Sequence, residues 1–197
     1  MSFRNSVVGV LTVPALVILG ACSDDTNATP QVVFDGQLTT GNHSAATCGE
    51  GGQGITVGAF ANLNRSTPEG SAPVKDGDDF EGTRVSVACS VVAAGANTFN
   101  VNGTVDFAGS NGGVFRVDGQ FTTTGDQNNI HAFFSRRASG NSYDETDRQC
   151  TVKYTSSVQG VVAGRVWGEI DCPNMYNANA DRTCGFKAQF RFENCAQ

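Results

Sequence analysis

Apolar and polar residues alternate along most of the chain beyond residue 30. The clearest case spans residues 185–194, where Phe or Ala occupies every second position from 186 to 192 and the positions between hold Lys187, Gln189 and Arg191. A period of two places successive side chains on opposite faces of an extended chain. This segment is therefore predicted to be a β-strand with one buried face and one face in solvent.

The same alternation predicts about nine strands, and no segment shows the 3.6-residue period of an amphipathic helix. The expected strands lie at residues 31–38, 55–63, 85–91, 99–107, 115–121, 130–136, 150–154, 164–172 and 185–194. Strands that are apolar on one face only are typical of antiparallel sheets around a single core. We therefore expect an all-β domain, an antiparallel β-sandwich stapled by disulfides. Its core is expected to include Phe99, Phe107, Phe115, Phe121, Phe190 and Phe192.

The connections between these strands are short and rich in glycine, of which the chain has 24. Residues 108–113 include an Asn-Gly pair, which is a typical hairpin turn. Because most successive strands have links of hairpin length, an up-and-down β-barrel is the alternative architecture. The longest irregular stretch, residues 64–80, predicts an exposed loop. Its acidic end, residues 76–81, lacks the spacing of a helix-flanked calcium loop, so we expect a solvated loop there.

The N-terminal residues have the three parts of a secretory signal: Arg4, an apolar run over residues 7–21, and small residues at its end. The run is shorter than the ~20 residues that span a bilayer. It closes on Leu-Gly-Ala followed by Cys22, an order that resembles the lipobox of bacterial lipoproteins. The resemblance implies that the leader, residues 1–21, is removed and that Cys22 carries fatty acyl chains such as palmitate. The alternative is an ordinary cleaved signal with Cys22 as a structural cysteine.

Residues 22–30 are polar and are expected to form a lipidated tether, followed by a single β domain over residues 31–197. In Gram-negative lipoproteins an Asp after the lipidated Cys retains the protein in the inner membrane. Ser23 occupies that position here, so the resemblance implies a cell-envelope location in the outer membrane. In other bacteria it implies the outer face of the plasma membrane. The membrane, reached through the anchor at Cys22, is thus an expected partner.

Seven cysteines are present, and with Cys22 assigned to the lipid an even number remains. In an exported chain these read as three disulfides, because no close CxxC or CxxH pair suggests a metal site. They are Cys48, Cys89, Cys150, Cys172, Cys184 and Cys195. The last two flank a predicted strand and are too far apart to pair. Cys172 and Cys184 bracket a polar segment and are a candidate pair, while the other pairings stay open. The tail, with Cys172, Cys184 and Cys195, is similar to cysteine-rich envelope lipoproteins of uncharacterised role.

Charge argues against a nucleic-acid partner. Removal of the leader takes away one positive charge, Arg4, and changes the formal net charge from −6 to −7. Nucleic-acid-binding proteins carry a basic patch instead. With two histidines and no Gly-x-Ser-x-Gly motif, the chain also offers no nucleophile–base pair. We expect no enzymatic activity, no cofactor and no metal.

The candidate binding residues are Trp167 and Tyr176. Trp167 falls in the polar register of its strand, and an exposed tryptophan among polar groups is suited to a glycan or protein contact. The alternative is that a loop or neighbouring strand covers it. Tyr176 lies in the Asn-rich segment just beyond and is a candidate for the same patch. We expect a non-catalytic surface-interaction module of unknown ligand, with a structural envelope component as the alternative.

Overall fold

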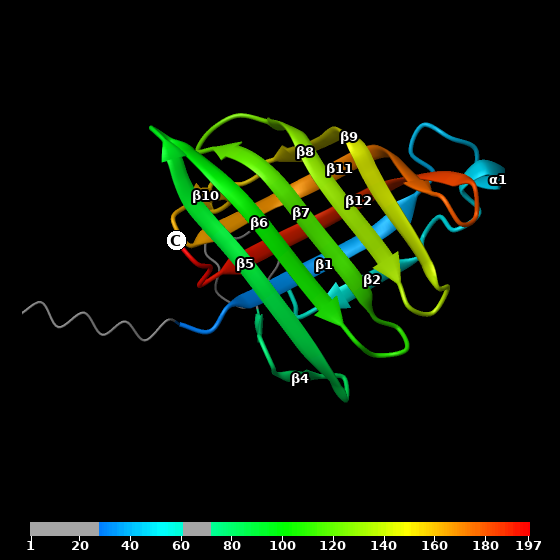
Figure 1. The fold of residues 1–197 in the computed structure, drawn as a ribbon, viewed down its shortest axis with the longest axis horizontal. Helices are drawn as coiled ribbons and strands as arrows, with labels where there is room; N and C mark the ends of the chain where they lie inside the picture. The colour runs from blue at the N-terminus through cyan, green and yellow to red at the C-terminus, as the bar shows by residue number, and fades with distance from the viewer. Residues whose placement is uncertain (1–27, 61–71) are drawn as a thin grey trace, which may run out of the picture.

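The computed structural model describes residues 28–60 and 72–197, which form one sheet-based domain (Figure 1). Twelve strands and one short helix make up this part of the chain. The elements are β1 (Gln31–Thr39), α1 (Ala45–Cys48), β2 (Gly54–Val57), β3 (Val74–Lys75), β4 (Asp79–Phe80), β5 (Thr83–Gly95), β6 (Thr98–Phe107), β7 (Gly113–Thr122), β8 (Gln127–Arg136), β9 (Asn141–Lys153), β10 (Gly160–Val162), β11 (Arg165–Asn177) and β12 (Arg182–Glu193). The predicted all-β class is confirmed.

The strands pair antiparallel in the order β2-β1-β12-β11-β9-β8-β7-β6-β5-β4, with β10 added beside β11 and β3 beside β1. From β5 to β9 each strand pairs with the next one in the chain, as hairpin-length links require. The first long strand, β1, pairs with the last, β12. Figure 1 shows the long strands wrapping around a common interior.

The sheet is almost closed where β5 meets the C-terminal residues. The amide of Val91 donates to the Ala196 carbonyl at 2.8 Å, and the amide of Ala196 donates to the Cys89 carbonyl at 3.0 Å. A disulfide joins Cys89 to Cys195 at the same place. The expected disulfide-stapled β-sandwich around one core fits this arrangement, and the alternative up-and-down barrel is also consistent with it.

Aromatic rings fill the interior. Of the six phenylalanines predicted for the core, Phe99 is partly buried and packs against it, and the other five are buried: Phe107, Phe115, Phe121, Phe190 and Phe192. Glycine provides room for one of these rings. A Cβ atom on Gly103 would lie 2.7 Å from the Cε2 atom of Phe192, closer than carbon atoms approach.

Several boundaries differ from the alternation pattern. Strand β9 begins at Asn141, well before the expected residue 150, because a buried glutamate, Glu145, occupies an inward position and masks the apolar period. Strands β3, β4 and β10 and helix α1 are too short to give a period. The expected strand at 55–63 ends at Val57, and its last three residues lie outside the described part of the chain, as do residues 64–71 of the expected loop.

Candidate functional site

Two rows of polar side chains cross the outer face of β1, β12, β11 and β9. The strand register aligns Asp35 with Gln189, Gln189 with Glu169, and Glu169 with Lys153. Two residues further along each strand, the register aligns Gln37 with Lys187 and Lys187 with Asp171. The positions between the rows point into the core, so the rows form two parallel walls on the outside of the sheet.

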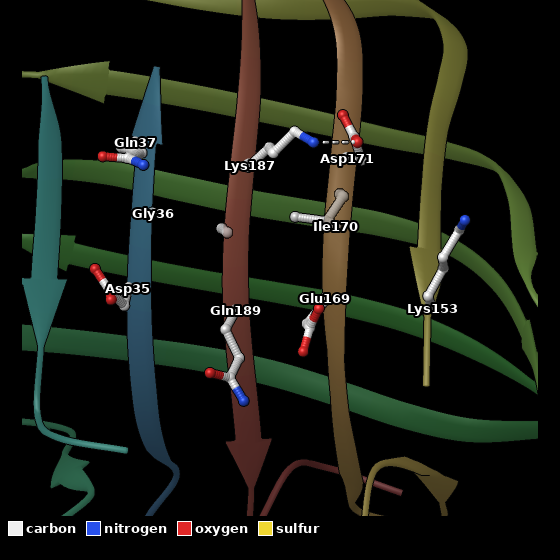
Figure 2. A pocket seen from close by; sticks show the side chains of 10 residues that line it. Asp35, Gly36, Gln37, Lys153, Glu169, Ile170, Asp171, Lys187 and Gln189 are labelled. Atoms are coloured by element: carbon white, nitrogen blue, oxygen red, sulfur yellow. Dashed lines mark ion pairs between the residues drawn. The ribbon is translucent and has the colours of Figure 1, made fainter. Parts of the chain in front are cut away.

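A groove of about 440 Å³ lies between these walls. Its floor is the backbone around Gly36, Ala188 and Ile170, whose side chains are absent, small or directed inward. Figure 2 shows the two walls on either side of Gly36 and Ile170. We call this feature the outer-face groove, and its polar walls are Asp35, Gln37, Lys153, Glu169, Asp171, Lys187 and Gln189.

The charges of the groove are largely paired across the strands. The Lys187 ammonium lies 2.9 Å from the Asp171 carboxylate, and the Lys153 ammonium lies 3.7 Å from Asp126 (Figure 2 shows the first pair). Glu169 accepts a hydrogen bond from the Thr155 hydroxyl at 2.6 Å. The groove therefore presents ammonium donors and carboxylate acceptors side by side, which suits a ligand with many hydroxyl groups.

Gln189, in one wall of the groove, carries a buried polar atom. Its Nε2 atom is buried and has no hydrogen-bond partner among the described residues. A buried donor without a partner has lost its hydration, so this atom costs free energy in the folded protein. A second hollow of about 450 Å³ continues the surface and shares Lys153, Asp171 and Lys187 with the groove.

Trp167 lies on the outer face of β11, as its register predicts, but the prediction of an exposed side chain is wrong. Its exposed fraction is 5%, and its ring lies 6.2 Å from that of Phe60 and 5.0 Å from the Arg191 guanidinium. Phe60, three residues after β2, stacks on it, and that contact between distant segments is not visible in the alternation of β11. The alternative reading, a covered outer-face tryptophan, is the one that the structure supports.

Tyr176 is exposed, and its hydroxyl donates to Asp181 at 2.9 Å. The hydrogen bond and the negative charge of Asp181 raise the pKa of Tyr176. Nine residues separate Tyr176 from Trp167 along β11, so at ~3.3 Å per residue the two lie near opposite ends of the strand. The structure does not bring the two candidate binding residues together, and neither lines the outer-face groove.

The six cysteines of the domain form three disulfides, as predicted: Cys48–Cys184, Cys89–Cys195 and Cys150–Cys172. The suggested Cys172–Cys184 pair is wrong. Strand β11 runs on to Asn177, so the segment between the two cysteines is mostly strand, and Cys172 faces Phe186 while Cys184 faces Met175. The register that aligns Asp171 with Thr151 places Cys172 opposite Cys150 instead. Cys22 lies outside the described residues.

The other titratable cluster on the outer face crosses β7, β8 and β9. The two ring nitrogens of His131 lie 2.5 Å from Asp118 and 2.8 Å from Asp144, and Arg148 pairs with Asp118 at 3.1 Å. Burial alone lowers the pKa of His131, but the hydrogen bonds and negative charges of the two aspartates outweigh it and raise the pKa. Because both nitrogens face carboxylates, neither is left to accept a proton from a hydroxyl.

This cluster predicts a pH-dependent contribution to stability. A raised folded-state pKa means that protonated His131 stabilises the fold fully below the ordinary pKa of 6.5, and that this contribution is lost as the pH rises through the folded value. Because the side chains are partly exposed, we expect less than about 1 kcal/mol. In urea unfolding, the parent should have a higher free energy of unfolding than His131→Gln at mildly acidic pH, and this difference should disappear at mildly alkaline pH. A His43→Gln control should behave as the parent does, and parallel changes in all three proteins would contradict the prediction.

Carboxylates of the acidic segment after β3 serve the fold. Asp76 Oδ1 accepts the Val87 amide at 2.8 Å, and Asp78 Oδ2 accepts the Lys75 amide at 3.1 Å. Within residues 28–60 and 72–197, no group of three or more His, Cys, Asp or Glu side chains is placed to hold a metal ion. The described residues also contain no helix that is long and apolar enough to span a membrane.

Comparison of the chain with protein-family models, with curated protein sequences and with solved structures finds no match. The site must therefore be interpreted from its own geometry.

Sequence reasoning missed the outer-face groove, although its residues lie on polar strand faces that the alternation identified. Lys187 and Gln189 lie on the predicted solvent face of their strand, and Glu169 and Asp171 share the polar register of Trp167 in theirs. What was missing is the pairing of β1 with β12 and of β11 with β9, which puts these faces into two continuous rows. A solvent-facing row of Gln, Lys, Asp and Glu without an aromatic residue does not by itself indicate a binding site.

Proposed function

We propose that the chain is a lipid-anchored cell-envelope protein that acts as a non-catalytic binding module. The lipobox resemblance at Cys22 supports the anchor, and three disulfides fit an oxidising compartment outside the cytoplasm. In this proposal the membrane is the outer membrane of a Gram-negative cell or, in other bacteria, the outer face of the plasma membrane. Mass spectrometry of the N-terminal peptide tests the anchor, because the peptide should begin at Cys22 and carry the added mass of the lipid. An unmodified Cys22 would contradict the proposal.

The outer-face groove is the observation that carries the binding role. It combines two ammonium groups, three carboxylates and two carboxamides on an open surface. Donors and acceptors in alternation suit the hydroxyl groups of a glycan better than an apolar ligand. A glycan of the cell envelope is therefore the proposed ligand, and a polar protein surface is the second choice.

A structural envelope component without a small ligand is the second candidate function. It is favoured by the internal pairing of the groove, since Lys187, Asp171 and Glu169 already have partners within the sheet. A ligand must compete with these contacts. Direct measurement of binding separates the two functions.

The binding role predicts that the double variant Asp171→Ala/Lys187→Ala loses its ligand while its stability hardly changes. Hydrogen bonds to charged groups contribute ~1.5–3 kcal/mol, so affinity should fall about tenfold or more. The exposed ion pair itself contributes at most about 1 kcal/mol to folding. A glycan array and a pull-down from envelope extracts provide the measurement.

The matched control is Asp106→Ala/Arg137→Ala, which removes another outer-face ion pair and also leaves the net charge unchanged. It should bind as the parent does. Equal binding by both double variants would exclude the groove as the site. If the parent captures nothing in either assay, the binding proposal fails and the structural candidate remains.

A further inference from the structure

The turns of the sheet are segregated into two ends. The residues just before β1, where the described chain begins, lie at the same end as the C-terminus, and Figure 1 shows β10 and the turn between β5 and β6 there, with α1 at the opposite end. The Asn194 side chain donates to the Thr29 carbonyl at 3.1 Å, and the Gly164 amide donates to the Val91 carbonyl at 3.2 Å. We call this the terminal end, and it comprises residues 28–30, 92–98, 122–127, 154–164 and 194–197.

The terminal end is the part of the domain closest to the proposed anchor. Six residues lead from Cys22 to Ala28, where the described chain begins. Fully extended, they reach about 20 Å at ~3.3–3.6 Å per residue. Strands of 12 or 13 residues, such as β11 and β12, span about 40 Å. The α1 end is therefore held away from the membrane whenever the strands stand upright on it.

Two segments of the terminal end are uncharged. Residues 92–98, which form the β5–β6 turn, and residues 154–164, which contain β10, hold no charged side chain. An anionic lipid surface repels carboxylates, so these uncharged segments are the parts of this acidic protein that can approach headgroups at the least electrostatic cost. The acidic segment after β3 borders them, since the Asp76 amide donates to the Pro30 carbonyl at 2.8 Å. Of the charges near this end, Asp126 is paired with Lys153 and Glu193 with Arg191, and Arg165 lies opposite Glu193 in the strand register.

Exposed apolar side chains lie at the same end. Among the described residues the exposed large hydrophobic side chains are Val92, Val162 and Tyr176, and the first two have exposed fractions of 40% and 46%. Val92 adjoins Val91, and Val162 lies two residues before Gly164, so both valines are close in sequence to the hydrogen bond between the Gly164 amide and the Val91 carbonyl. Exposed alanines adjoin both valines in sequence.

We infer that the terminal end rests on the bilayer that holds the lipids of Cys22, with Val92 and Val162 at the boundary between headgroups and acyl chains. The inference depends on the proposed lipid anchor and adds the orientation of the domain on the membrane. Shallow insertion of small apolar side chains beside a covalent anchor adds to its hold on the membrane. The outer-face groove then lies on the side of the upright domain, open to a ligand in the surrounding space.

Tryptophan reporters in the full-length, lipidated protein test this orientation. Val162→Trp and Val92→Trp place a reporter at the terminal end in two independent positions, and Asn179→Trp places the matched control in the exposed turn between β11 and β12. Each protein is reconstituted into phosphatidylcholine vesicles with and without bromine near the headgroup end of the acyl chains. The parent protein, whose one tryptophan is Trp167, supplies the background emission.

Bromine should quench the added emission of both terminal-end variants and leave that of Asn179→Trp unchanged. Equal quenching of all three reporters, or of none, would overturn the orientation if mass spectrometry shows an acylated Cys22. An unacylated Cys22 would overturn the anchor itself and the orientation with it. The use of two reporter positions keeps the test valid if one substitution prevents folding.

Discussion

Phe115→Ala is expected to destabilise the domain by about 3–5 kcal/mol, the range for truncation of a buried aromatic residue. Phe115 is 1% exposed, and its ring lies 4.4 Å from that of Phe34 and 5.8 Å from those of Phe186 and Phe190. Strand β7 does not pair with β1 or β12, so these contacts cross the interior and hold opposite walls of the sheet together. Urea unfolding followed by circular dichroism provides the measurement.

Phe133→Ala is the matched control, because Phe133 lies on the outer face of β8 under the Arg116 guanidinium, 5.1 Å from its ring. Loss of this cation–π contact should cost about 1 kcal/mol. Equal destabilisation by the two variants would show that the ring cluster does not hold the walls together.

Removal of the Cys89–Cys195 disulfide by paired alanine substitutions is expected to cost about 4–5 kcal/mol. The bridge closes a loop of 106 residues and joins β5 to the C-terminal segment at the seam of the sheet. In the chain-entropy account, a loop of this length restricts the unfolded state by about 4.7 kcal/mol. The unfolding midpoint in urea should fall accordingly, and proteolysis should begin near the seam.

The Cys150–Cys172 bridge is the internal comparison, because it staples neighbouring strands and closes a loop of only 22 residues. Its removal should cost about 3 kcal/mol on the same reasoning. A larger loss for this staple than for the seam bridge would contradict the assignment of β5 and the C-terminal segment as the closure of the sheet.

The fold class followed from local information. Alternation of side chains depends only on neighbours two residues apart, so strands such as β6, β7 and β12 and their buried phenylalanines could be predicted directly. Where an inward-facing position is polar, as at Glu145, the alternation of apolar and polar residues breaks down, and the start of the strand, here β9, cannot be predicted from it. The number of disulfides also followed, because it depends only on counting cysteines once Cys22 is set aside.

By itself, the sequence determined an all-β, acidic domain with three disulfides, and through the lipobox it predicts export and the anchor. The tertiary structure decided what depends on strand pairing between distant segments. Pairing of β11 with β9 placed Cys172 opposite Cys150, and Phe60 stacked on Trp167. Pairing of β1 with β12 aligned Asp35 and Gln37 with Gln189 and Lys187 into a groove. Register joins residues more than a hundred positions apart, and no local period carries that information.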